Sequence, residues 1–242
     1  MALPKIQHPL FDLTIPSTKQ KIKFRPFLVK EEKILLLAQE SNNVGGMVHA
    51  IKQIISNCVV EDIKVDKLPS FDIEYIFIQI RANSVGETAK LQITDKELEK
   101  PLLVDVDLRE IKVQWQENHK QHIDITNDIS IDMKYPTYDD VLNLSTNKEE
   151  ENQEGPIADQ TFEMITNCID KVYSGDNQET IHELKDYTDE ESKEFLESLP
   201  SEAFKEIQLF FDTMPKLQHT IEYKVKNKIK KHTFSGINDF FI

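Results

Sequence analysis

Glycine and cysteine are scarce in this chain, and each shortage excludes a class of functional site. Only six glycines occur among 242 residues, and neither G-x-G-x-x-G nor G-x-x-x-x-G-K-[ST] is found, which argues against a phosphate-binding loop. The two cysteines, Cys58 and Cys168, are too few for a disulfide framework or a cysteine metal site. Each lies in an apolar run with helical character, which predicts a small buried side chain rather than a reactive thiol.

Long apolar runs are also missing. No stretch of about 18 apolar residues occurs, so the sequence predicts no membrane-spanning helix. The first residues, M-A-L-P-K-I-Q-H-P-L-F, have neither the cationic flank nor the long apolar stretch of a signal peptide. We therefore expect the protein to be made and to fold in a cytoplasm.

Catalytic motifs are absent as well. The sequence contains no H-E-x-x-H, C-x-x-C or G-x-S-x-G, its seven histidines are scattered, and its carboxylates cluster on helices that look exposed. A catalyst needs a nucleophile, a base and an orienting group, or a metal. We predict a protein that is not an enzyme, with no catalytic, cofactor-binding or metal-binding residues, no cofactor and no small-molecule substrate.

Negative charge is abundant but unevenly placed. The net charge is −14, which disfavours nucleic acid and anionic membranes as partners of the whole molecule. Residues 1–33 carry seven Lys/Arg against three acids, residues 224–231 carry five lysines, and residues 176–202 hold ten acids against two lysines. Separate basic and acidic faces suit docking to a charged partner. The alternatives are a solvated, polarised surface and a nucleic-acid site on the 224–231 lysines.

The first half of the chain changes its hydrophobic period several times. Alternation around Pro16-Ser17-Thr18 predicts a β-hairpin over residues 10–27, and helix formers follow from Lys30. A second helix is expected through residues 47–58. The run that starts at Pro69-Ser70 has Ser70 as a good N-cap, but its β-formers leave helix and strand both open. Strands are expected at 90–93, 103–106, 111–113, 123–126 and 129–133.

The second half is predicted to be mostly helical. Thr137 with Asp140 resembles a capping pair for a short helix over 141–144, and the polar run S-T-N-K-E-E-E-N-Q-E-G-P follows it. Helices are expected at 157–173, 189–199 and 201–214, and a lysine-rich hairpin at 216–234. The predicted fold class is α+β: an N-terminal β-hairpin and helices, central antiparallel strands, and a C-terminal helical region ending in a β-hairpin. The expected domains are 1–144 and 157–242, joined by an acidic linker at 145–156.

Two short segments of the chain resemble each other. I-I-S-N-C-V at 54–59 echoes M-I-T-N-C-I at 164–169, and each is followed by Pro-Ser and an aromatic amphipathic segment. Two copies of one helical unit would explain the echo, and a chance match is the alternative.

Several blocks together resemble a known family. They are M-A-L-P-K, L-T-I-P-S-T, K-I-K-F-R-P-F-L-V-K-E-E-K-I-L-L-L-A, F-D-I-E-Y-I-F-I-Q-I-R-A-N-S-V-G-E, F-F-D-T-M-P-K-L-Q-H and G-I-N-D-F-F. They are similar to the baseplate hub subunit and hub assembly proteins of T-even-like contractile-tailed bacteriophages. The resemblance covers most of 1–115 and 200–241, whereas 140–195 matches nothing in that pattern.

The resemblance implies a late protein of virion assembly that builds the central hub of the tail baseplate together with other hub proteins. It also implies that residues 71–80 are helical. The interaction residues that match the family signature are Arg25, Pro26, Phe27, Lys30, Glu31, Glu32, Met214, Pro215, Phe240 and Phe241.

Two of these positions have internal alternatives. Arg25 either presents its guanidinium to a partner carboxylate or pairs with Glu31 or Glu32 within the chain. The aromatic end of the chain, with Phe240 and Phe241, is either a partner anchor or folds back onto the protein's own core. An interface role predicts that Arg25→Ala weakens partner binding more than stability.

The function expected from the sequence is a structural or assembly component of the hub that acts through protein–protein interfaces. The protein would be found in the host cytoplasm during assembly and in the tail baseplate. The alternative is a transient assembly chaperone that is absent from the mature virion.

Overall fold

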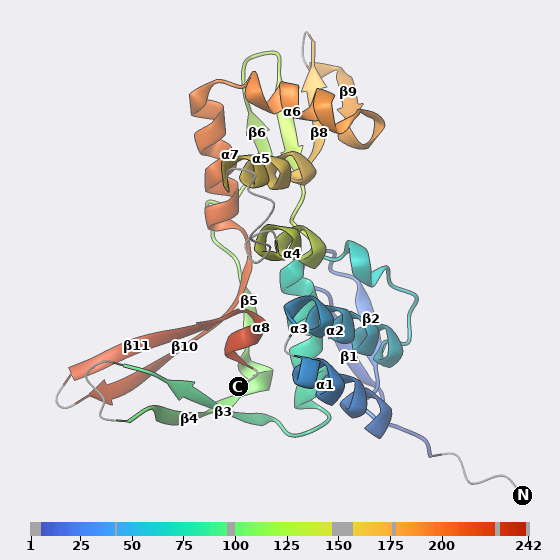
Figure 1. The fold of residues 1–242 in the computed structure, drawn as a ribbon, viewed down its shortest axis with the longest axis vertical. Coiled ribbons are helices and arrows are strands. Elements are labelled where there is room, and N and C mark those ends of the chain that lie inside the picture. Colours follow the sequence, from blue (N-terminus) through green and yellow to red (C-terminus); the bar gives the residue numbers. More distant parts are fainter. Residues whose placement is uncertain are drawn as a thin grey trace, which may run out of the picture. The chain divides into compact units, whose positions relative to one another are not determined.

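The chain divides into two compact units. In the computed structural model, residues 6–41, 43–95, 100–146, 157–175, 178–225 and 228–240 are described (Figure 1). Unit 1 comprises residues 1–114 and 216–242, and unit 2 is the continuous stretch 115–215 between them. Neither division falls in the expected 145–156 linker. Most of that segment, 147–156, lies outside the described residues, so the linker stays a prediction.

Unit 1 opens with the predicted hairpin, followed by helices. The alternation of the sequence places Leu13, Ile15, Ile22 and Phe24 in the core, because side chains two apart on a strand share one face. The hairpin and both following helices are confirmed. The elements are β1 (Phe11–Thr14), β2 (Lys21–Phe24), α1 (Val29–Ser41) and α2 (Val44–Cys58), with the 3-10 turn η1 (Val65–Lys67) after them.

The segment whose period left helix and strand open is the helix α3 (Ser70–Ala82). Nine of its residues are buried, which explains why its sequence lacks a polar face and hence a clear helical period. The prediction that Ser70 caps this helix is wrong. The N-cap is Pro69, and Ser70 is already the first helical residue.

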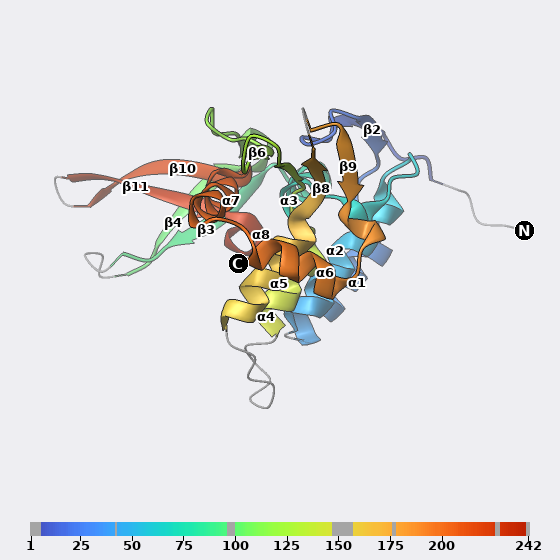
Figure 2. The same ribbon diagram turned by 90° about the horizontal axis from the view of Figure 1, so that it is seen from above.

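Antiparallel strands complete unit 1. Figures 1 and 2 show two long hairpins extending side by side away from α3. Asp95, just after the first hairpin's leading strand, accepts hydrogen bonds from the Tyr223 hydroxyl at 2.7 Å and from the Lys230 amine at 2.9 Å, which ties the hairpins together. The elements are β3 (Thr88–Ile93), β4 (Leu102–Asp107), η2 (Leu108–Glu110), β5 (Lys112–Gln114), β10 (Lys216–Val225), β11 (Lys228–Ser235) and α8 (Gly236–Asp239); β3 pairs with β4, and the other sheet has the order β11-β10-β5.

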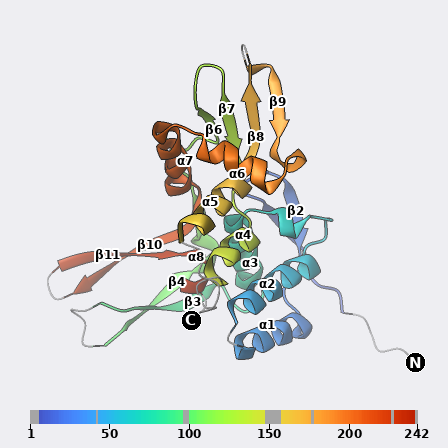
Figure 3. The same cartoon turned by 45° about the horizontal axis from the view of Figure 1, so that its top comes forward.

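Unit 2 is a four-stranded antiparallel sheet with helices, and Figure 3 shows its strands side by side. The expected Thr137–Asp140 capping pair is present: Thr137 N–H donates to the carboxylate at 2.8 Å, and Asp140 N–H donates to the threonine hydroxyl at 3.3 Å. The elements are β6 (His122–Asp124), β7 (Ser130–Met133), α4 (Tyr138–Thr146), α5 (Ile157–Cys168), β8 (Ile169–Ser174), β9 (Thr180–Glu183), η4 (Leu184–Asp186), α6 (Asp189–Glu197) and α7 (Ser201–Thr213), and the sheet order is β6-β7-β8-β9.

One helix prediction is wrong in its second part. Residues 157–168 are helical, but 169–173 belong to strand β8, which pairs with β7. Ile169 and Val172 are both buried, with a shift of register between their partners Met133 and Ile131, and long-range pairing decides the conformation. The α+β fold class, with an initial hairpin and helices, central antiparallel strands and a terminal hairpin after helices, is confirmed.

The sequence echo has a structural counterpart. Both units contain a hairpin, two helices and a later helix that begins after Pro, in the same order. We call residues 11–82 the first copy and residues 121–213 the second copy. In the first copy the Leu13–Ile22 pair of the hairpin is buried, and in the second copy the Ile123–Ile131 pair is buried.

The strongest match is a backbone hydrogen bond at the end of the second helix. The N–H of Arg25, just after β2, donates to the carbonyl of Cys58 at 2.9 Å. The N–H of Lys134, just after β7, donates to the carbonyl of Cys168 at 2.8 Å. Each cysteine is the last residue of its helix and is buried, as the sequence predicted. These matches favour two copies of one module over chance.

The copies differ in the segment that joins their second helix to the helix that begins after Pro. In the first copy residues 59–69 connect α2 to α3. In the second copy residues 169–199, which we call the acidic segment, form β8, β9, η4 and α6 before α7 begins. The acidic segment contains ten Asp/Glu and three lysines, a net −7 that is half of the −14 of the whole chain.

Candidate interaction surfaces

Arg25 lies in an internal ion-pair network of unit 1. Its Nη2 is 3.0 Å from Glu31 Oε1 and donates to the carbonyl of Asn57 at 2.8 Å, while Nη1 is 3.6 Å from the sulfur of Cys58. The Arg25 side chain is 16% exposed and that of Glu31 is fully buried. Of the two interpretations of Arg25, the structure therefore confirms the pairing with Glu31.

The electrostatics of this network follow from its burial. Burial alone would raise the pKa of Glu31, but hydrogen bonds from Arg25 and from the N–H of Leu28 outweigh it and hold the pKa below its usual value. Burial raises the pKa of the Cys58 thiol to about 11, although the neighbouring Arg25 opposes that rise. The thiol is therefore protonated at neutral pH and unsuited to nucleophilic chemistry.

The remaining signature residues of the N-terminal block divide by exposure. Pro26 and Phe27 are partly buried, and the Phe27 ring lies 5.7 Å from that of Phe77. Lys30 and Glu32 are exposed on the first turn of α1. Among the signature residues that the structure describes, these two side chains are the most accessible to a partner.

The C-terminal signature residues lie mostly inside the protein. Phe240 is 1% exposed and belongs to the core of unit 1, with its ring 6.1 Å from that of Phe234, so the fold-back alternative is confirmed for this residue. Phe241 lies outside the described residues. Met214 is partly buried and Pro215 is buried.

An apolar face on α1 was not predicted from the sequence. Val29, Leu36 and Leu37 are 81%, 54% and 55% exposed. The L-L-L run at 35–37 carried the signal, because three consecutive helical residues span about 200° of the helix surface and cannot all face one neighbour. Exposed large apolar side chains on one helix suit a protein interface.

The lysine-rich hairpin is less strongly basic than its sequence suggests. Lys230 pairs with Asp95 at 2.9 Å, and Lys231 lies 3.3 Å from Glu222 on the neighbouring strand. These ion pairs reduce the charge available to a phosphate backbone.

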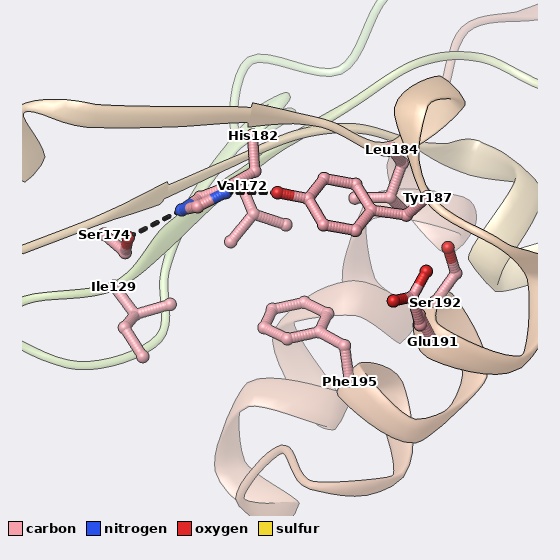
Figure 4. A pocket seen from close by; sticks show the side chains of 9 residues that line it. All are labelled: Ile129, Val172, Ser174, His182, Leu184, Tyr187, Glu191, Ser192 and Phe195. Atoms are coloured by element: carbon pink, nitrogen blue, oxygen red, sulfur yellow. Dashed lines mark hydrogen bonds between the residues drawn. The ribbon is translucent and has the colours of Figure 1, made fainter.

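A mainly apolar pocket of about 370 Å³ lies in unit 2 between the sheet and α6 (Figure 4). His182 lies between two hydroxyls: its Nε2 is 2.9 Å from Ser174 Oγ, and its Nδ1 is 2.6 Å from the Tyr187 hydroxyl. In Figure 4, Phe195 and Ile129 lie across the hollow from this chain of hydrogen bonds. The full lining is Ile129, Val172, Ser174, His182, Leu184, Tyr187, Glu191, Ser192 and Phe195.

The acidic segment builds this pocket almost alone. Every lining residue except Ile129 belongs to residues 169–199, and Glu191 places a carboxylate at its side. Glu191 is also the last member of a capping box with Thr188, which orders the start of α6. Sequence reasoning identified the excess of acids but missed the pocket, because it expected β8 to be helical and did not identify β9.

Other kinds of site are not seen in the described residues. Nowhere among them do three or more His, Cys, Asp or Glu side chains gather as a metal site would require. None of the helices in that part of the chain combines the length and the apolar character needed to cross a bilayer.

Comparison with known proteins places the chain in a family. No curated protein and no solved structure gives a significant match. The family described as T4 bacteriophage base plate protein matches residues 8–242, which is almost the whole chain and includes both units. The chain thus belongs to the T4 bacteriophage base plate protein family.

Proposed function

We propose that this baseplate protein is a structural and assembly component of the central hub, where it acts through protein–protein interfaces. The observation that carries the proposal is the family match over residues 8–242, which includes all the blocks that resemble hub assembly proteins except M-A-L-P-K at residues 1–5. The exposed apolar face of α1 fits such a role, since an apolar patch on a soluble chain is commonly an interaction site. The partners would be other hub proteins, met first in the host cytoplasm and then in the tail baseplate.

The direct test removes the gene for this chain from the phage and examines infected cells by electron microscopy. We expect no complete baseplates, and co-expression of the chain with other hub proteins should give a defined complex. Normal baseplates from the deletion would overturn the proposal. Mass spectrometry of purified virions then decides between the two roles, because a transient chaperone would be present in the lysate and absent from the particle.

Among the signature residues, we propose that Lys30 and Glu32 form part of the hub interface. Both are exposed, so Glu32→Lys should leave the melting temperature nearly unchanged while weakening the complex, whereas Lys30→Glu also removes the 3.4 Å ion pair of Lys30 with buried Glu31 and should lower both the melting temperature and the affinity. The control is Lys21→Glu, at an exposed position of strand β2 in the same unit. Equal weakening by the control would show that unit 1 responds to charge in general rather than at these two positions.

A further inference from the structure

The acidic segment differs from the rest of the module in a way that points to recognition. The first copy connects its last two helices with residues 59–69, whereas the second copy uses 169–199. The longer connection lines a pocket and carries a net charge of −7, whereas residues 59–69 of the first copy carry a net charge of −1. An added element with a hollow and a strong charge suits the binding of another molecule.

The pocket itself indicates the chemistry of its occupant. Its floor and walls are apolar side chains, including Val172, Leu184 and Phe195, and its volume of about 370 Å³ suits one or two large apolar side chains rather than a whole domain. The polar side chains along one wall form hydrogen bonds with one another, so they do not require a polar ligand. They are Ser174, His182 and Tyr187.

The negative charge around the pocket favours a partner segment with basic residues on either side of the apolar anchor. Glu191 lines the hollow, and Asp189, Glu190 and Glu194 are exposed on the same helix. A partner segment whose apolar anchor is flanked by Lys or Arg gains attraction there, whereas an acidic segment is repelled. Anchors that fill a pocket carry most of the binding energy, and the charged rim sets the encounter rate.

From the pocket, the charge and the difference between the copies, we propose that the acidic segment docks a cationic segment of a partner baseplate protein, with one aromatic or aliphatic side chain in the 129–195 pocket. The identity of the partner as a baseplate protein rests on the proposed function. The binding chemistry rests on the pocket alone.

The test uses the full-length chain and a short fluorescein-labelled peptide with a central phenylalanine flanked by lysines, followed by fluorescence anisotropy. We expect binding that weakens about tenfold or more when the phenylalanine becomes alanine, because the aromatic ring is then lost from the apolar pocket. A peptide with glutamates in place of the lysines should not bind, and added salt should weaken the lysine peptide. Equal binding of the alanine peptide, or binding of the glutamate peptide, would overturn the proposal.

Two variants locate the site. Ser192→Leu fills the hollow from a buried position and should abolish binding, whereas the matched control Ser198→Leu, on an exposed position just after α6, should retain it. Glu191→Gln keeps the capping box, because Gln serves in place of Glu there, and should weaken binding two- to threefold through charge alone.

If Ser192→Leu fails to fold, a cross-linking experiment locates the binding site instead. A benzophenone in place of the peptide's phenylalanine should label Val172, Leu184 or Phe195, and labelling confined to other regions would contradict the proposal. Failure of this docking proposal is distinguishable from failure of the proposed hub role. Normal baseplates in the gene deletion would remove the hub role and leave peptide binding unaffected.

Discussion

The two copies of the module share a backbone hydrogen bond and surround it with different side chains. In the first copy, Arg25 and Glu31 form a buried ion pair beside Cys58. At the corresponding positions of the second copy, Lys134 is exposed and Asp140 joins a capping box with Thr137. The same backbone arrangement thus accommodates a buried ion pair in one unit and a partly buried capping pair in the other, so the ion pair is not required by the fold of the module.

The last helices of the two copies, α3 and α7, share one set of buried positions but differ in how many further residues they bury. Both α3 and α7 have 13 residues, and the buried positions of α7 are Ala203, Ile207, Phe210 and Thr213. The corresponding positions of α3 are Asp72, Ile76, Gln79 and Ala82, and all are buried. Helix α3 also buries its other side, where the core of unit 1 includes Ile78. A common stripe therefore packs the module, and α3 buries further residues, of which Ile78 packs with the strands of unit 1 and Phe77 against Phe27.

The largest difference in lost stability between the copies is expected when the basic side chain beside the shared backbone hydrogen bond is removed. Arg25→Ala leaves the fully buried Glu31 without its main partner and should cost about 3–5 kcal/mol. Lys134→Ala removes an exposed side chain and should change stability by about 0.5 kcal/mol or less. Urea unfolding of both variants at neutral pH, followed by circular dichroism, measures the two losses.

Two further variants separate charge from packing in that experiment. Arg25→Ala combined with Glu31→Gln should recover part of the loss, because the buried charge is gone. Equal losses for Arg25→Ala and Lys134→Ala would contradict the difference between the copies. A stable Arg25→Ala chain that no longer binds hub proteins would instead favour the interface role of this residue.

A smaller difference is expected from the buried carboxyl of α3. Burial raises the pKa of Asp72 to about 6 from 3.8, although Ser17 hydrogen-bonds the carboxylate and lowers it in part. Between these values the folded state holds a proton that the unfolded state has lost, so this contribution to stability is complete below about pH 3.8 and disappears as the pH rises through 6. The shift corresponds to about 3 kcal/mol.

Asp72→Asn tests this pH dependence. The free energy of unfolding of the variant, relative to the original chain, should increase from pH 4 to pH 7. The second copy has Ala203 at the corresponding position and offers no such titration. Asp124→Asn, at an exposed carboxyl, is the control and should leave the pH profile unchanged. A profile that is the same with and without the Asp72 carboxyl would contradict the assignment.

Much of the fold followed from periodicity in the sequence. The first hairpin, α2 and the 216–234 hairpin were predictable because each has one buried face and therefore a clear period of 2 or 3.6, whereas α1, whose buried residue is Glu31, was predictable from its run of helix formers. Strand β8 was not, because Ile169 directly continues the apolar run of α5 and is fixed as a strand only by pairing with the distant β7. Helix α3, buried on most sides, had no polar face to show its period.

The candidate site was less predictable for a related reason. The acids of the acidic segment are visible in the sequence, but the pocket depends on Val172, His182 and Phe195 meeting across three elements. Such a meeting is set by tertiary packing, which no local pattern encodes. For Phe240 likewise, the sequence left a partner anchor and a fold-back onto the core both open, and the structure packs it into the core.

The smallest difference between the copies is expected at the start of their first helices. Thr137→Ala removes the side-chain oxygen that accepts from the N–H of Asp140, and should cost about 1 kcal/mol. The reciprocal change, Leu28→Thr, should give no gain, because the N–H of Glu31 already donates to the carbonyl of Leu28 at 2.9 Å and has no need of a hydroxyl. Thermal melts of both variants check this. A stabilisation by Leu28→Thr as large as the loss from Thr137→Ala would contradict this difference and mean that the two helix starts are equivalent.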